Sequence, residues 1–179
     1  MEQFKDFNEI IEPDVRNGFV KYDLKKSTSI KVTQKEIYNI IEKNSLSSTV
    51  PEDVKSYFNT IRNLCIYAWY YYPFYTTANF LFSTAIEMAL RIKFNDKETA
   101  FKNLIKKAIK QGLIRNEEFY HEDSKENNSI DFIEILKETI PYLRNSAAHS
   151  EYNAIIPPNY TLEMLKITTN LINQIFSKD

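Results

Sequence analysis

The residues best suited to chemistry lie in one short stretch near the carboxyl end of the chain, which reads Arg144-Asn145-Ser146-Ala147-Ala148-His149. Arginine stays charged at any working pH, and its planar guanidinium can bind a phosphate through two parallel hydrogen bonds. Histidine can both accept and donate a proton near neutral pH. Together these two side chains meet the minimum requirement for cleaving a phosphodiester without a metal ion.

The chain has one other histidine, and it also follows an Arg-Asn pair: Arg115-Asn116 precedes His121. This second stretch comes after Gly112, contains two consecutive glutamates and continues into the polar residues 122–128, a pattern typical of a loop. The glutamates would repel an approaching phosphate. We therefore interpret His121 as an ordinary surface histidine.

Helical spacing makes a shared site at the first stretch feasible. Asn145 and His149 are four residues apart and fall on one helical ridge, while Arg144 is offset by about 100° and must use its long side chain to reach the same ligand. The two alanines between them keep the surface low enough for a partner helix to approach. Pro141 removes one backbone donor, so we expect a bend just before the stretch.

Composition limits the class of protein. With 179 residues, 43% apolar and 14% aromatic, the chain is long enough for one globular domain with a real core. The net charge of −1 means that any contact with nucleic acid must come from a local patch. Cys65, the only cysteine, excludes an intramolecular disulfide and is expected in the core.

No membrane or secretion signal is expected. There is no N-terminal hydrophobic run like a signal peptide, and polar residues interrupt the most apolar region, Leu64 to Ile92. Two histidines far apart and one cysteine cannot build a zinc site, and no glycine-rich phosphate loop occurs. We therefore expect a cytoplasmic protein with no metal, no cofactor and no membrane contact.

The pattern of apolar residues predicts an all-α fold. Thr33-x-x-Glu36 predicts a capping box for a short helix that ends near Asn44, and Thr49-x-x-Glu52 predicts the start of a long helix. Before them, residues 19–24 and 29–32 form either a short hairpin or an irregular arm. Only two glycines occur, which argues against a turn-rich β fold.

Four further helices are expected. The second long helix follows Pro73 and is expected to be central, with a buried face of Phe74, Ala78, Leu81, Ala85, Met88 and Ile92. Asn95-x-x-Glu98 predicts the cap of a third helix that stops at Gly112, the fourth begins near residue 129, and the last follows Pro157-Pro158. We expect an antiparallel bundle of four to five main helices over residues 49–179, with residues 1–48 as an extension that contains a short helix.

Three segments in this order resemble the HEPN family, the "higher eukaryotes and prokaryotes nucleotide-binding" helical domains. Bacterial members have an alanine-rich Glu-x-x-Leu-Arg helix, a short helix that ends in Gly-Leu-Ile, and then Arg-Asn-x-x-Ala-His. Here they read Ala85-Ile86-Glu87-Met88-Ala89-Leu90-Arg91, Lys110-Gln111-Gly112-Leu113-Ile114 and Leu143-Arg144-Asn145-Ser146-Ala147-Ala148-His149. The resemblance covers about residues 50–176.

The resemblance implies a metal-independent endoribonuclease that acts as a homodimer, of the kind found in toxin–antitoxin and phage-defence systems. Its catalytic residues would be Arg144, Asn145 and His149, with Glu87, Ser146 and Tyr152 in support. Cleavage of RNA through its own 2′-hydroxyl needs a base, an acid and positive charge at the phosphorane. One chain offers a single candidate histidine, whereas a two-fold axis would supply two.

Tyr152 departs from the family pattern. HEPN toxins paired with nucleotidyltransferase antitoxins carry His-x-Tyr, and the tyrosine is the residue that becomes modified. Here the tyrosine follows His149 by three positions. This puts control by tyrosine modification in doubt and leaves the Arg-His pair unaffected.

Each highlighted residue also has a purely structural interpretation. His149 can complement a helix C-terminus, Arg144 can pair with Glu138 or Glu151, and Glu87 with Arg91 can form an i,i+4 salt bridge. Lys102, Lys106, Lys107 and Lys110 form a basic stripe, which is either a solvated helix face or an RNA contact. The aromatic run 69–75 either packs in the core or stacks on bases. The alternative function is a catalytically inactive HEPN module that binds RNA or a partner protein.

Overall fold

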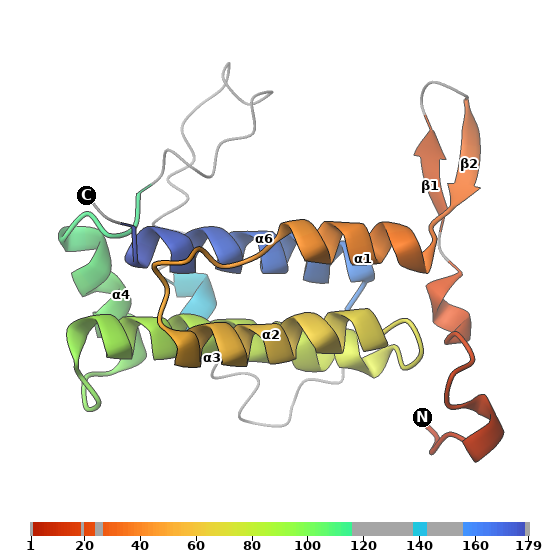
Figure 1. The fold of residues 1–179 in the computed structure, drawn as a ribbon, viewed down its shortest axis with the longest axis horizontal. Helices are drawn as coiled ribbons and strands as arrows, with labels where there is room; N and C mark the ends of the chain where they lie inside the picture. Colours follow the sequence, from red (N-terminus) through yellow and green to blue (C-terminus); the bar gives the residue numbers. More distant parts are fainter. Residues whose placement is uncertain (1, 19, 24–26, 116–137, 143–155, 178–179) are drawn as a thin grey trace.

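The computed structural model describes residues 2–18, 20–23, 27–115, 138–142 and 156–177. In these residues the protein is predominantly helical, as the sequence predicts. The main helices are α1 (Gln34–Lys43), α2 (Glu52–Tyr67), α3 (Pro73–Phe94), α4 (Phe101–Lys110) and α6 (Pro158–Ile175), and residues 138–142 are also helical. Figure 1 shows α1 and α6 alongside one another above α2 and α3, with α4 at one end.

Helix α3 lies at the centre of the packing. It contacts α2, α4 and α6, while α1 contacts both α2 and α6. The central position expected for this helix is therefore confirmed. The helices share one core, whose largest fully buried side chains include Phe58, Ile61, Phe82, Ile86, Leu90, Leu104, Leu165 and Leu171.

Helix α1 belongs to the same core, although it lies in the segment predicted as an extension. Ile37 and Ile41 are buried on its inner face. The predicted capping box at its start is present, because the Thr33 hydroxyl accepts from the Glu36 amide at 3.3 Å and the Glu36 carboxylate accepts from the Thr33 amide at 2.9 Å.

Two other predicted caps are wrong. Helix α2 begins at Glu52 with Pro51 as its N-cap and no side-chain cap, since the Thr49 hydroxyl pairs with the Ser47 hydroxyl at 2.7 Å. Asn95 does not start α4 but ends α3, in a left-handed conformation with φ of 49°. Both errors arise because a cap depends on backbone conformation as well as on residue type.

Helix α4 ends at the glycine that the sequence indicates. Gly112 has a φ of 70°, its amide donates to the carbonyl of Ile109, and the next amide, of Leu113, donates to the carbonyl of Ala108. These two hydrogen bonds define a Schellman motif, which requires the left-handed backbone that glycine adopts without strain.

Residues 20–23 and 28–31 form the two strands of the hairpin, the first of the two alternatives. Strands β1 (Val20–Asp23) and β2 (Thr28–Lys31) pair antiparallel, with Val20 opposite Lys31. Figure 1 shows the hairpin projecting away from the helices. It connects α1 to an N-terminal arm, residues 2–18, that contains two short 3-10 turns, Phe7–Glu9 and Val15–Asn17.

A buried carboxylate fastens this arm to the turn between α2 and α3. Asp14 accepts from the Arg16 guanidinium at 2.7 and 2.8 Å and from the backbone amide of Tyr72 at 3.0 Å. The side-chain amide of Asn17 donates to the carbonyls of Ala68 and Trp69 at 2.9 and 2.8 Å. The arm is therefore joined to the bundle by polar contacts between segments more than 50 residues apart.

We predict that two substitutions only two positions apart on α3 have very different effects on stability. Leu90 is fully buried, so Leu90→Ala should lower the free energy of unfolding by about 2–5 kcal/mol. Ile92, predicted to be buried, is instead 39% exposed, so Ile92→Ala should cost less than about 1 kcal/mol. Urea denaturation of both variants measures the difference, and equal losses would contradict the assigned faces of α3.

Candidate functional site

The predicted catalytic residues lie outside the described part of the chain. This applies to Arg144, Asn145, Ser146, His149 and Tyr152. It also applies to the predicted start of the fourth helix and to His121. Three described segments bear on the site. Residues 138–142 directly precede the motif, and the second half of α3 and helix α4 carry the other two segments of the resemblance.

The residues that lead into the motif are held against the helical core. Ile140 is 2% exposed and belongs to the same core as α3 and α6, and Pro141 is also buried. On the exposed side, Lys102 of α4 donates to the Glu138 carboxylate at 2.6 Å. These contacts place the segment just before the motif beside α4.

Glu87 and Arg91 form the i,i+4 salt bridge considered from the sequence. The Glu87 carboxylate accepts from Arg91 Nη2 at 2.6 Å and Nε at 3.1 Å, and Arg91 Nη1 donates to the carbonyl of Asp96 at 3.3 Å. Glu87 is 8% exposed. A carboxylate at such a depth needs a close cationic partner, and Arg91 supplies it while also bonding the chain just after the end of α3.

The four lysines of α4 do not share one environment. Lys102 pairs with Glu138, and the Lys107 ammonium lies 4.3 Å from the centre of the Phe94 ring. Lys106 and Lys110 are exposed on the same helix, opposite its buried residues Leu104, Ile105 and Ala108. The stripe therefore presents positive charge at the end of the bundle that holds α4.

Cys65 is a core residue, as predicted. It is fully buried and free, and burial raises the pKa of its thiol to about 12. Burial likewise raises the pKa of the Tyr75 hydroxyl. Neither group can act as a nucleophile near neutral pH, because the reactive form of each is the anion.

The aromatic run 69–75 mainly packs. Tyr72 and Tyr75 are buried and meet edge to face, with ring centres 5.4 Å apart. Tyr71 and Phe74 meet in the same way at 5.1 Å and are half-buried. Of the two interpretations given to this run, packing accounts for its inner members.

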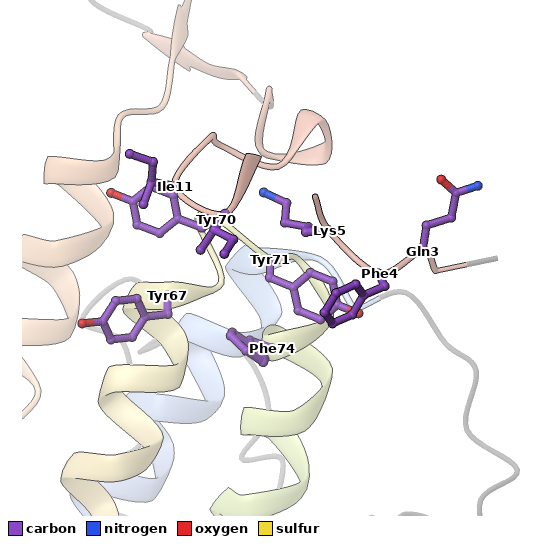
Figure 2. Close-up of a pocket in the computed structure, with 9 residues that line it drawn as sticks. Gln3, Phe4, Lys5, Ile11, Tyr67, Tyr70, Tyr71 and Phe74 are labelled. Carbon is purple, nitrogen blue, oxygen red and sulfur yellow. The ribbon is translucent and has the colours of Figure 1, made fainter. Parts of the chain in front are cut away.

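The outer members of the aromatic run line a cavity that the sequence did not reveal. Its volume is about 580 Å³, and its second wall is the N-terminal arm. Figure 2 shows Phe4 and Ile11 of the arm near the rings contributed by the end of α2, the turn and the start of α3. Local sequence gives no signal for it, because it forms only when the arm folds back. The lining consists of Gln3, Phe4, Lys5, Ile10, Ile11, Tyr67, Tyr70, Tyr71 and Phe74.

Two features are absent from the described ranges. No group of three or more histidine, cysteine, aspartate or glutamate side chains there could hold a metal ion. None of the described helices is long and apolar enough to span a membrane.

Comparison with known proteins gives no match: no family model, no curated protein and no solved structure is similar to this chain. The function of the site must therefore be inferred from its own residues and their chemistry.

We predict that the two ion pairs around the candidate site differ in strength. A double-mutant cycle with Glu87→Gln and Arg91→Gln should give a coupling energy of about 1 kcal/mol or more, because the carboxylate is largely buried. The exposed pair, probed with Lys102→Gln and Glu138→Gln, should give less than about 0.5 kcal/mol. Urea denaturation of each single and double variant measures the free energies of unfolding. A larger coupling energy for the exposed pair than for the buried pair would contradict this prediction.

Proposed function

We propose that this chain is a metal-independent endoribonuclease of the HEPN type that cleaves RNA in a cleft shared by two copies. The observation that carries the proposal is the Arg144-Asn145-x-x-x-His149 motif, placed after the Glu87–Arg91 and Gly112-Leu113-Ile114 segments in the family order. In this proposal residues 49–179 form the antiparallel HEPN-like bundle. The protein would act in the cytoplasm, in a toxin–antitoxin or phage-defence system, with an antitoxin or another defence protein as a possible partner.

The proposed roles follow from the chemistry of each side chain. One His149 accepts the proton of the RNA 2′-hydroxyl, whose oxygen attacks the adjacent phosphorus, and the partner's His149 protonates the departing 5′-oxygen. Arg144 stabilises the charge that develops on the phosphorane. Asn145 orients the phosphate, with Ser146 and Tyr152 in support. The products are a 2′,3′-cyclic phosphate and a 5′-hydroxyl.

Several described features support this proposal. The family's alanine-rich helix would be α3, whose buried Ala85 and Ala89 lie on either side of Glu87 in the sequence. Its short helix would be α4, which stops at Gly112. The contacts of Ile140 and Glu138 anchor the segment just before the motif. The α4 lysines would contact the RNA backbone, which carries one negative charge per nucleotide.

The alternative remains a catalytically inactive HEPN module that binds RNA or a partner protein. The exposed apolar residues of the N-terminal arm favour a role in protein binding. The two functions are separated by the catalytic experiment below.

We predict that the protein is a symmetric dimer with residues 144–149 near its axis. Light scattering at tens of micromolar should give twice the chain mass. Ala148→Arg should shift the protein toward the monomer, because a long charged side chain would separate the two copies. Ser56→Arg, at an exposed small residue of α2, is the matched control and should stay dimeric. A monomeric wild type would contradict the shared cleft.

We predict that His149→Ala abolishes RNA cleavage, since a histidine is the group suited to proton transfer near neutral pH. Arg144→Ala should lower the rate by about 100- to 1,000-fold, and Arg144→Lys should restore little because the planar guanidinium is lost. His121→Ala is the matched control and should cleave like wild type. The assay uses purified protein and total RNA with EDTA present.

The product ends provide an independent check of the same mechanism. They should carry 2′,3′-cyclic phosphate, and an RNA with a 2′-deoxy sugar at the cleavage position should resist. Equal cleavage by wild type and His149→Ala would assign the activity to a contaminant. If no RNA is cleaved while the dimer still binds RNA or a protein, the inactive module is the correct alternative.

A further inference from the structure

The N-terminal arm and the turn after α2 form an exposed apolar surface around the cavity. Phe4 is fully exposed, and Ile10, Ile11 and Tyr67 are 51%, 75% and 56% exposed. At about 150–250 Å² for a whole aromatic side chain, Phe4 and Tyr67 together expose on the order of 300 Å², and the two isoleucines add to this area. The largest apolar patch on a typical monomer is about 300–600 Å² and is often functional, so this patch is a candidate interaction site.

The surface is held in place before any partner binds. Burial acts to raise the pKa of Asp14, but hydrogen bonds from Arg16 and from the Tyr72 amide outweigh it and lower this pKa to about 2. The carboxylate is therefore ionised at every pH above about 4. The Arg16 guanidinium, which also pairs with Glu2, lies 4.9 Å from the centre of the Tyr72 ring. An arm fixed in this way loses little conformational entropy on binding.

The charges on the arm determine which partner suits it. Residues 2–12 contain four carboxylates and one lysine, and the Lys5 ammonium already donates to the carbonyls of Glu9 and Glu12 at 2.7 and 2.8 Å. Asp6, Glu9 and Glu12 are exposed. These carboxylates would repel an RNA backbone, and two copies of the arm would repel each other. They would attract a cationic segment.

We propose that this surface binds a basic amphipathic segment of another protein, with large apolar side chains in the cavity and lysines or arginines facing Asp6, Glu9 and Glu12. A volume of about 580 Å³ accepts more than one large side chain. The five aromatic rings that line the cavity provide rigid apolar contacts at small entropic cost. This proposal does not depend on the proposed ribonuclease activity, because it uses none of the residues of the motif.

The test uses three fluorescein-labelled 18-residue peptides and the full chain, with binding measured by anisotropy at physiological salt. One peptide is an amphipathic helix of leucine and lysine. The second replaces each lysine by glutamate, and the third replaces each leucine by serine. The leucine–lysine peptide should bind at least tenfold more tightly than either of the others, since it alone combines apolar contact with positive charge.

Variants locate the binding to this surface. Phe4→Ser with Ile11→Ser should weaken binding of the leucine–lysine peptide at least tenfold, whereas Ile92→Ser, at a partly exposed position near the far end of α3, should leave it unchanged. Glu9→Lys with Glu12→Lys should reverse the preference between the lysine and glutamate peptides. Asp14→Asn should also weaken binding, although Asp14 does not line the cavity, because it releases the arm.

Four outcomes would overturn the proposal. Equal binding of the lysine and glutamate peptides would show that apolar contact alone drives binding. The absence of binding would show that this surface is not a peptide-binding site. If the Phe4→Ser and Ile11→Ser variant instead changes the mass of the protein in light scattering, the occupant is a second copy of this chain. If it loses affinity for RNA while peptide binding is unaffected, the occupant is a nucleic acid.

Discussion

The burial of α3 is the constraint on which the rest of the structure depends. Helices α2, α4 and α6 all pack against it, so most of its side chains face protein. Small residues at Ala78, Ala85 and Ala89 let the neighbouring helices approach closely. The polar residues of this helix must then find partners within the protein. Asn79 donates to the Thr161 hydroxyl of α6 at 2.6 Å, and Glu87 pairs with Arg91.

Local sequence predicted those features of the fold that local physics determines. The capping box at Thr33 and the glycine stop at Gly112 are both present, and the Glu87–Arg91 pair follows directly from helical spacing.

The same Thr-x-x-Glu pattern failed at Thr49. There Pro51, with its fixed φ, takes the N-cap position, and the Thr49 hydroxyl is already bonded within the preceding turn. Asn95 failed for a related reason, because asparagine tolerates the left-handed conformation that ends a helix as well as the extended conformation that begins one. A residue pattern therefore indicates that a helix end is near, and the backbone decides which end it is.

The parts of the site that could not be predicted from the sequence are contacts between residues far apart in the chain. Glu138 pairs with Lys102, 36 residues away, and no local pattern indicates this partner. Asp14 gave no signal at all, because its role depends on the Tyr72 amide, 58 residues along the chain. The cavity is the clearest case, since one wall comes from residues 3–11 and the other from residues 67–74. The chemical type of each residue is known directly from the sequence, whereas its surroundings depend on residues far along the chain. The assignment of Arg144 and His149 therefore remains a prediction from chemistry and spacing.

The near-zero net charge is not evenly distributed, because the start of the N-terminal arm and helix α4 carry charges of opposite sign. Residues 2–12 carry four carboxylates and one lysine, whereas α4 carries four lysines and no acid. Figure 1 shows the arm and α4 at opposite ends of the helices. At physiological ionic strength charges are screened over about 8 Å, so each end acts on its own surroundings. Under the proposed function, an RNA strand would be drawn to the α4 end, beside the segment that leads into the Arg-His motif, and repelled by the arm. A basic protein segment would be drawn to the arm and repelled by α4. Under the two proposals, the nucleic acid and the protein partner bind at opposite ends of the bundle and do not compete.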